Sequence, residues 1–227
     1  HWVLARLGKR VLRPGGMGLT RWLVDKLDIG AEDHVVEFAP GMGRTAQLVL
    51  EKQPASYTAV ERDADAAATV TRWLGASQSS RRVITGQAQA TGLPDNSADV
   101  VYGEAMLTMQ GDARRREIVA EAHRLLRSGG RYGIHELALD RVAEADIESV
   151  RKRITSAIHH QAHPMRLDQW ARMLEDAGFR VEQRTTAPMA LLEPVRLIRD
   201  EGLLGAARFA GRLLTRGPER RRVLEMR

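Results

Sequence analysis

Residues 34–43, HVVEFAPGMG, decide the fold of this chain. The stretch opens with an apolar run, residues 34–39, that predicts a buried β-strand. The run leads directly into the turn Pro40-Gly41-Met42-Gly43, and the pattern of residues 44–53 predicts a helix behind the turn. A glycine-rich turn between a buried strand and a helix lets a ligand approach the backbone closely. We therefore expect a ligand site at this turn.

The alternation of strands and helices continues on both sides of this stretch. Further strands are predicted at 57–61, 82–85, 99–103, 131–138 and 179–186. Helices are predicted over 2–12, over 21–28 with Thr20 as its cap, from Asp112 to the Gly129-Gly130 pair, over 142–161, and from Asp168 to Gly178. This spacing predicts an α/β fold, with a doubly wound, mostly parallel sheet and helices on both faces. The ligand of such a sheet lies beyond the carboxyl ends of the strands.

Length and composition indicate one globular unit with extra segments. The chain has 227 residues, of which 43% are hydrophobic and 28% charged. No apolar run approaches the roughly 20 residues that a membrane span needs. We expect an N-terminal helical cap over 1–30, the sheet domain over 31–187 with a substrate-lid segment at 139–165, and a C-terminal helical extension over 188–227.

Charge and cysteine content narrow the function classes. The chain has no cysteine, which excludes disulfides, Cys-ligated zinc and thiol nucleophiles and is compatible with the cytoplasm. The formal net charge of +6 is spread along the chain and mixed with acids. The one dense basic cluster, Arg216 with Arg220, Arg221 and Arg222, lacks interleaved aromatic residues. We therefore expect no nucleic-acid partner.

Two acidic residues near the turn indicate the kind of ligand. The spacing of Gly41, Gly43 and Ala46 also fits a dinucleotide pattern, so an NAD(P)-linked oxidoreductase is one alternative. Glu37 at the end of the first strand would repel a pyrophosphate and attract an ammonium group. Glu61, which ends the second predicted strand, can accept hydrogen bonds from both ribose hydroxyls. Together they favour an adenosine ligand with a cationic tail, such as S-adenosylmethionine.

Four segments then resemble the motifs of one family in the correct order. They are VVEFAPGMGRTA (35–46), AVERDADAAA (59–68), TGQAQATGLPDNSADVVY (85–102) and EAHRLLRSGGRYGIHEL (121–137). Over residues 13–187 the chain resembles class I S-adenosylmethionine-dependent methyltransferases, with the ubiquinone/menaquinone-type and related small-molecule branches most similar. The resemblance implies a Rossmann-like fold and in-line transfer of a methyl group to a small organic acceptor, with S-adenosylhomocysteine as the product. A non-catalytic cofactor-binding protein is a second alternative.

Carried over by position, the resemblance also implies a cofactor site. Glu37 would receive the amino group, Glu61 would hold the ribose, and Arg62 would pack beside the adenine. The remaining expected contacts are the turn residues Ala39, Pro40, Gly41 and Gly43, the adenine-edge residues Gln87 and Ala88, the post-strand residues Glu104 and Ala105, and Gly16 and Met17 in a loop over the cofactor. The chain departs from the family at Gln87, where an acid is usual, and it shows no candidate after residue 188 for the antiparallel last strand of the family sheet.

The sequence says less about the residues that would face the methyl acceptor than about the cofactor site. His135 and Glu136 at the end of the fifth strand and His159 in the following segment are catalytic candidates, since an imidazole near neutrality can act as a general base. His159 and His163 have a spacing that suits a metal, but no Glu or Cys completes a ligand set, so no metal is predicted.

Two features exclude particular acceptors. The absence of cysteine excludes cytosine C5 methylation and thiol-dependent arsenic methylation. The Asn/Asp-Pro-Pro-Tyr signature of amino-directed nucleic-acid methylation is missing at 102–105, where the sequence is YGEA. We expect a small, partly apolar organic acceptor; oligomeric state is not set by the sequence.

Overall fold

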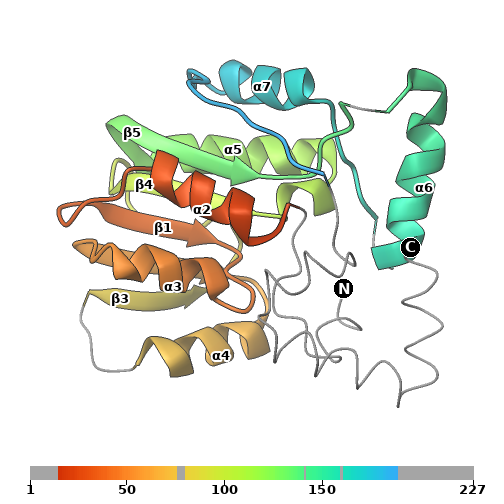
Figure 1. Cartoon of the computed structure of the whole chain (residues 1–227). Helices are drawn as coiled ribbons and strands as arrows, with labels where there is room; N and C mark the ends of the chain where they lie inside the picture. The colour runs from red at the N-terminus through yellow and green to blue at the C-terminus, as the bar shows by residue number, and fades with distance from the viewer. Residues whose placement is uncertain (1–14, 76–79, 141, 159–160, 189–227) are drawn as a thin grey trace, which may run out of the picture.

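A five-stranded sheet forms the centre of the molecule. The computed structural model describes residues 15–75, 80–140, 142–158 and 161–188. The strands β1 (His34–Phe38), β2 (Ser56–Glu61), β3 (Arg81–Thr85), β4 (Ala98–Glu104) and β5 (Leu126–His135) lie in the order β3-β2-β1-β4-β5. All four ladders are parallel, which confirms the predicted doubly wound fold (Figure 1). The order reverses between β1 and β4, so the expected ligand crevice lies beyond the ends of these two strands.

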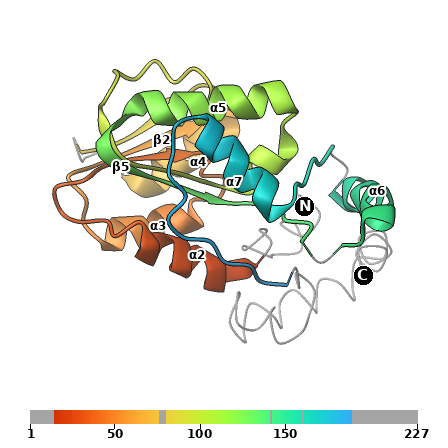
Figure 2. The ribbon, with the colours of Figure 1, turned by 90° about the horizontal axis from the view of Figure 1, so that it is seen from above.

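Helices cover both faces of the sheet. One face carries α2 (Gly16–Lys26), α3 (Arg44–Glu51) and α4 (Ala64–Leu74), and the other carries α5 (Asp112–Leu125) and α7 (Leu167–Asp176), as Figures 1 and 2 show. The 3₁₀ turns η1 (Leu107–Met109) and η2 (Glu144–Asp146) follow β4 and precede α6. Helix α6 (Ile147–Ile158) lies beyond the carboxyl ends of the strands in both views.

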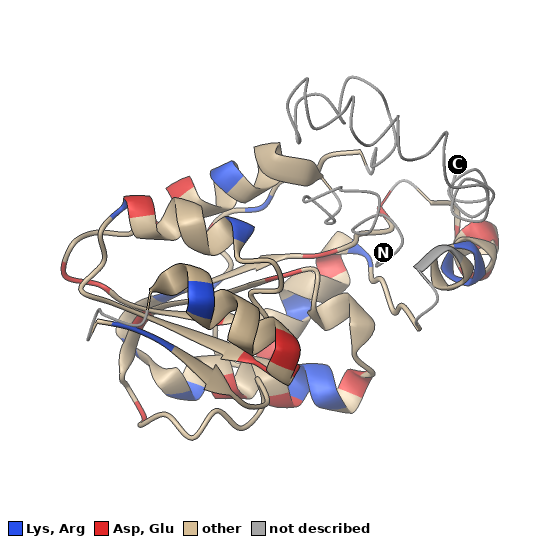
Figure 3. Ribbon diagram, turned by 90° about the horizontal axis from the view of Figure 1, so that it is seen from below, with Lys and Arg blue, Asp and Glu red and all other residues tan. Residues whose placement is uncertain are grey.

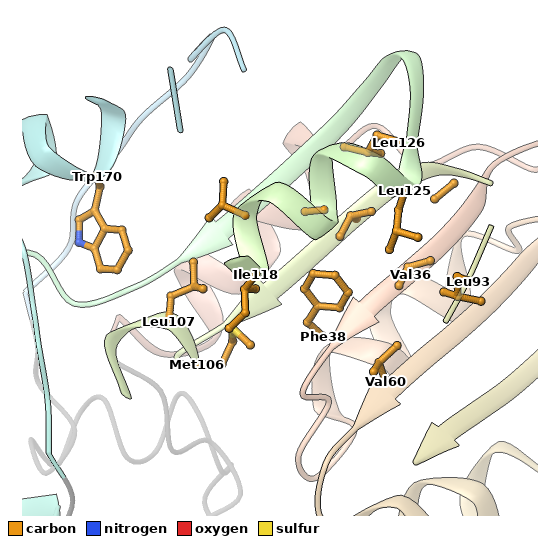
Figure 4. Packing of buried hydrophobic residues seen from close by; sticks show 14 residues of the cluster. Val36, Phe38, Val60, Leu93, Met106, Leu107, Ile118, Leu125, Leu126 and Trp170 are labelled. Carbon is orange, nitrogen blue, oxygen red and sulfur yellow. The ribbon is translucent and has the colours of Figure 1, made fainter. Parts of the chain in front are cut away.

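Alternating side chains of β1 divide the core into two layers. Val36 and Phe38 pack with Ile118 and Leu125 of α5 (Figure 4), whereas Val35 packs with the cluster on the opposite, α2–α3 face. Because successive strand residues point to opposite faces, Glu37 shares the α2–α3 face with Val35. This alternation places an acidic side chain inside the second layer.

Four sequence expectations differ from the structure. The helix expected over 142–161 is divided into the 3₁₀ turn η2 and helix α6 (Ile147–Ile158). The predicted strand at 179–186 was wrong: this segment has no regular secondary structure and pairs with no strand among the described residues. Helix α2 begins at Gly16 rather than after Thr20, so Thr20 lies inside the helix. Strand β5 begins at Leu126, because Leu126 pairs with Ala98 before a register shift brings Arg131 opposite Val100.

Several expectations fall on residues that the structure does not describe. These are the helix at 2–12, His159 and all but residue 188 of the C-terminal extension. Within the described ranges, no helix has the length and apolar character of a membrane span.

Candidate functional site

The turn after β1 forms an open cradle. Ala39, Gly41 and Gly43 all have positive φ angles of 53°, 56° and 69°. A Cβ built on Gly41 would have its nearest neighbour, the Ala39 carbonyl oxygen, at 4.0 Å. A Cβ on Gly43 would lie 2.1 Å from the Trp73 ring, so only glycine permits that packing. The turn therefore leaves backbone exposed on the Gly41 side and is closed by Trp73 on the Gly43 side.

Glu61 connects the end of β2 to this cradle. Its carboxylate accepts hydrogen bonds from the backbone N–H of Gly41 at 3.4 Å and of Asp63 at 3.0 Å. Asp63 in turn caps α4 by accepting from the Ala66 N–H at 2.9 Å, while Arg62 is exposed. Glu61 is only 8% exposed, so its carboxylate is held at the edge of the turn.

Glu37 lies beneath the same turn. It is 4% exposed and accepts a hydrogen bond from the Tyr57 hydroxyl. Burial, and next the negative charge of Glu37, raise the pKa of both Tyr57 and Tyr102 well above the usual tyrosine value. The two tyrosines therefore stay protonated beside this carboxylate.

Gln87 and Ala88 follow β3 on the far side of the cradle. Gln87 is exposed, and its side-chain oxygen accepts from Arg114 of α5 at 3.0 Å. Gln87 also forms an isolated antiparallel bridge with Ala90, while Ala88 packs against the core cluster on the α5 face. This short loop is thus fixed to both the sheet and α5.

Glu104 ends β4 and is the centre of a buried polar cluster. It accepts hydrogen bonds from the Thr20 hydroxyl of α2 at 2.8 Å and from the Thr45 hydroxyl of α3. Nδ1 of His135 lies 2.7 Å from the same carboxylate, and both side chains are 5% exposed. Ala105, with a φ of 54°, donates its N–H to the His135 carbonyl at 2.8 Å. Strands β4 and β5 are therefore joined at the site through side chain and backbone.

Glu136 supports the backbone after β4. One carboxylate oxygen accepts from the N–H groups of Met106 and Leu107, and the other from the N–H and hydroxyl of Thr108, at 2.6–3.0 Å. Burial raises the pKa of Glu136, although these four donors act in the opposite direction. The carboxylate thus caps η1 and has both oxygens occupied.

The loop expected over the cofactor lies against His135. Gly15 and Gly16 have φ angles of 73° and 60°, and Met17 is 3% exposed. A Cβ on Gly15 would lie 3.0 Å from Nε2 of His135. The described residues hold no group of three or more His, Cys, Asp or Glu that suits a metal ion.

Sequence reasoning missed the partners that organise this site. Thr20 was interpreted as a helix cap, and Thr45 was only part of a motif; both donate to Glu104. Thr45 is the second residue of a helix that follows a glycine turn, and this position is a signal that sequence reasoning could have used. The role of Thr20 depends on the tertiary contact between α2 and β4, which the sequence does not show.

The arrangement is chemically complementary to S-adenosylmethionine. An open backbone turn admits the amino-acid part of a ligand, a buried carboxylate below the turn is complementary to an ammonium group, and the carboxylate at the end of β2 suits ribose hydroxyls.

Comparisons with known proteins agree with this geometry. Residues 36–134 match the Methyltransferase domain family (Methyltransf_11). The chain is 31% identical over 211 residues to an uncharacterized protein of Haemophilus influenzae, covering 92% of this chain and 83% of that protein.

Two solved structures share the fold. The cyclopropane synthase MmaA2 of Mycobacterium tuberculosis has a TM-score of 0.67 at 16% identity, covering 92% of this chain and 73% of its own. An S-adenosylmethionine dependent methyltransferase of Mesorhizobium loti has a TM-score of 0.61 at 18% identity, covering 74% and 84%. No specific similarity to the ubiquinone-type branch emerges, but the family match decides between the cofactors that the sequence left open. Residues 36–134 belong to the Methyltransferase domain family, and the chain has the fold of class I S-adenosylmethionine-dependent methyltransferases.

Proposed function

We propose that the protein transfers the methyl group of S-adenosylmethionine to a small organic acceptor by in-line displacement. The observation that carries this proposal is a cavity of about 300 Å³ at the carboxyl end of β5, which is lined mainly by apolar side chains and bounded on one side by His135. This volume has the size of a small-molecule site. S-adenosylmethionine supplies an electrophilic methyl group on a sulfonium, whose C–S electron pair stays on sulfur.

The residues of the chain would bind and orient the two reactants. Glu37 and the turn from Ala39 to Gly43 would hold the methionine part, and Glu61 would exchange its contact with the Gly41 N–H for ribose hydroxyls. Gln87 and Ala88 would meet the adenine edge. Gly16, Met17 and Ala105 would enclose the centre of the site. The protein contributes alignment and electrostatics in such a reaction.

Among the catalytic candidates, the geometry favours His135. Both oxygens of Glu136 are engaged by backbone and hydroxyl donors. His135 lines the cavity, and its Nδ1 lies 2.7 Å from the Glu104 carboxylate. His159 lies outside the described residues and stays a candidate from the sequence.

The surface charge also supports a small acceptor over a nucleic acid. Figure 3 shows Lys and Arg interspersed with Asp and Glu along the described elements. Arginines pair with acids at Arg124–Glu121, Arg127–Asp99 and Arg131–Asp33, at distances of 2.8, 2.9 and 2.5 Å. A polyanion is bound by unneutralised positive charge, which these pairs reduce.

The cofactor assignment is tested by calorimetric titration of the full chain with S-adenosylhomocysteine. We expect binding to the wild type, no heat with NADH, and an affinity lowered about tenfold or more by Glu61→Gln, because hydrogen bonds to a charged carboxylate contribute about 1.5–3 kcal/mol each. Glu32→Gln, at an exposed position before the amino end of β1, is the matched control and should bind like the wild type. Equal affinities of the Glu61 variant and the wild type would contradict the ribose assignment.

A further inference from the structure

We propose that Gln87 recognises the adenine of the cofactor as a hydrogen-bond donor: its side-chain N–H group donates to ring nitrogen N1, and the 6-amino group of adenine receives no acceptor from Gln87. The inference rests on the proposed function, because it specifies how a residue assigned to the adenine edge distinguishes the base. It is carried by the hydrogen bonds of the Gln87 side chain, by the loop that holds this residue and by the chemistry of adenine.

The side-chain carbonyl of Gln87 already accepts two hydrogen bonds. The guanidinium of Arg114 on α5 donates to it at 3.0 Å, and the side-chain amide of Gln89 donates to the same oxygen. A carbonyl oxygen has two lone pairs, so both of its acceptor positions are in use. Nε2 of Gln87 makes no hydrogen bond to the part of the chain that the structure describes. Gln87 therefore offers a base a donor rather than an acceptor.

The orientation of the Gln87 amide is set by the chemistry of its neighbours. The oxygen and nitrogen of a side-chain amide are distinguished by their hydrogen-bond partners. A guanidinium carries only N–H donors, so the Gln87 atom that faces Arg114 is the carbonyl oxygen. Turning the amide over would place its N–H group against two other donors, those of Arg114 and Gln89. Arg114, which also lies 3.5 Å from Glu117 of its own helix, is thus a positioning residue for Gln87.

The loop after β3 places this amide beside the cofactor site. Gly86 donates its N–H to the main-chain carbonyl of Glu61 at 2.9 Å, which joins the loop to the residue assigned to the ribose. Ala90 donates its N–H to the main-chain carbonyl of Gln87 at 3.0 Å and closes the loop. Because the Gln87 side chain is exposed, a base bound beyond the ends of β2 and β3 can reach its amide.

Adenine presents a donor and an acceptor side by side on this edge. Its 6-amino group donates, and the neighbouring ring nitrogen N1 accepts. The N–H group of Gln87 is complementary to N1 and not to the 6-amino group, since two donors do not pair. A carboxylate has only acceptors, so an acid at this position would bond with the 6-amino group instead. Glutamine in place of an acid therefore changes which atom of the base is recognised.

The binding test compares three ligands by calorimetry on the full chain. They are S-adenosylhomocysteine, its analogue without the 6-amino group, and its 1-deaza analogue, in which a C–H group replaces N1. The wild type should bind the first two within about threefold of each other. It should bind the 1-deaza analogue about tenfold more weakly than S-adenosylhomocysteine, the loss that one hydrogen bond supports.

Two substitutions of Gln87 change the recognised atom in opposite ways. Gln87→Met keeps the length of the side chain without its amide, so S-adenosylhomocysteine and the 1-deaza analogue should bind equally. Gln87→Glu replaces the N–H group with an acceptor of the same shape. This variant should prefer S-adenosylhomocysteine about tenfold over the analogue without the 6-amino group.

Arg114→Ala tests the positioning step while Gln87 stays in place. Its loss frees one acceptor position of the Gln87 carbonyl, so the variant should prefer the ligand with the 6-amino group by about threefold or more. Arg116→Ala, at an exposed position of the same helix, is the matched control and should keep the wild-type ratios.

Four results would overturn the inference. They are a tenfold preference of the wild type for the 6-amino group, an undiminished loss with the 1-deaza analogue in Gln87→Met, no preference for the 6-amino group in Gln87→Glu, and wild-type ratios in Arg114→Ala. If the wild type does not bind S-adenosylhomocysteine, the proposed function is refuted instead, so the two failures are distinguishable.

Discussion

Replacing Ala39 with glycine should stabilise the protein. Ala39 has a φ of 53° in the cofactor turn, a left-handed conformation that costs a residue with a Cβ about 1–2 kcal/mol. Glycine removes this cost, but it also gives the unfolded chain more conformational freedom, which lowers the free energy of unfolding by about 0.4–1 kcal/mol. The half-buried Ala39 methyl packs on the core. Its loss lowers the free energy of unfolding by about 0.4 kcal/mol more, which is half the value of a fully buried methylene. The net gain is about 0.5 kcal/mol, or about 1–2 °C in Tm for a chain of this size.

Urea unfolding followed by tryptophan fluorescence measures this difference. Ala105→Gly, at a φ of 54°, should change the free energy of unfolding in the same direction, and the double variant should approach the sum of the two. Ala120→Gly, on the exposed face of α5, is the opposite control and should lose about 1 kcal/mol. If Ala39→Gly destabilises the protein as much as Ala120→Gly does, the strain argument for this turn is refuted.

Three further predictions concern buried contacts. Gly43→Ala should destabilise the protein by about 1–3 kcal/mol in the same urea assay, because its Cβ would lie 2.1 Å from the Trp73 ring; an unchanged midpoint would contradict that packing. Thr20→Val should lower the free energy of unfolding by about 1–2 kcal/mol, because Glu104 loses a hydrogen-bond donor. An unchanged free energy of unfolding would show that water replaces the Thr20 hydroxyl and would contradict this prediction. Hydrogen bonds from Arg124 lower the pKa of Glu121 to about 2, from 4.5. This contribution to stability is present above about pH 4.5 and lost as the pH falls towards 2, so Glu121→Gln should flatten the acid limb of a stability–pH curve, and an unchanged limb would contradict the assignment.

The central strands β1, β2 and β4 were predictable because they are buried on both faces. Continuous apolar runs such as that of β1 predict strands without reference to their neighbours, and the observed bounds of β1 and β2 differ from the predicted ones by one residue. The segment 179–186 has equally strand-like residues but lacks a ladder among the described residues, and a sequence pattern does not show whether a partner is present. The start of α2 was missed because its two glycines are poor helix formers, and packing on the sheet overrides that preference.

The residues of the candidate site were predictable from the sequence, but the hydrogen bonds between them were not. Positions next to the glycine turn follow from the order of strands, so the sequence placed Glu37 and Glu61 at the carboxyl edge. The hydrogen bond between Glu104 and His135 depends on the register of β4 and β5, in which these two residues lie opposite each other. Register follows from tertiary packing, so the sequence predicted both residues without predicting that they form a pair.

Helix α2 physically connects the two halves of the proposed site. A Cβ on Gly133 of β5 would lie 2.7 Å from Leu23, so glycine at this position lets the helix pack closely on the sheet. This close approach brings the Thr20 hydroxyl to Glu104 and Gly15 to Nε2 of His135. The same helix also supplies Leu19 and Trp22 to the cavity wall. A movement of α2 would therefore alter the cavity and the orientation of the imidazole together, which makes residues 15–26 part of the working site rather than a separate cover over it.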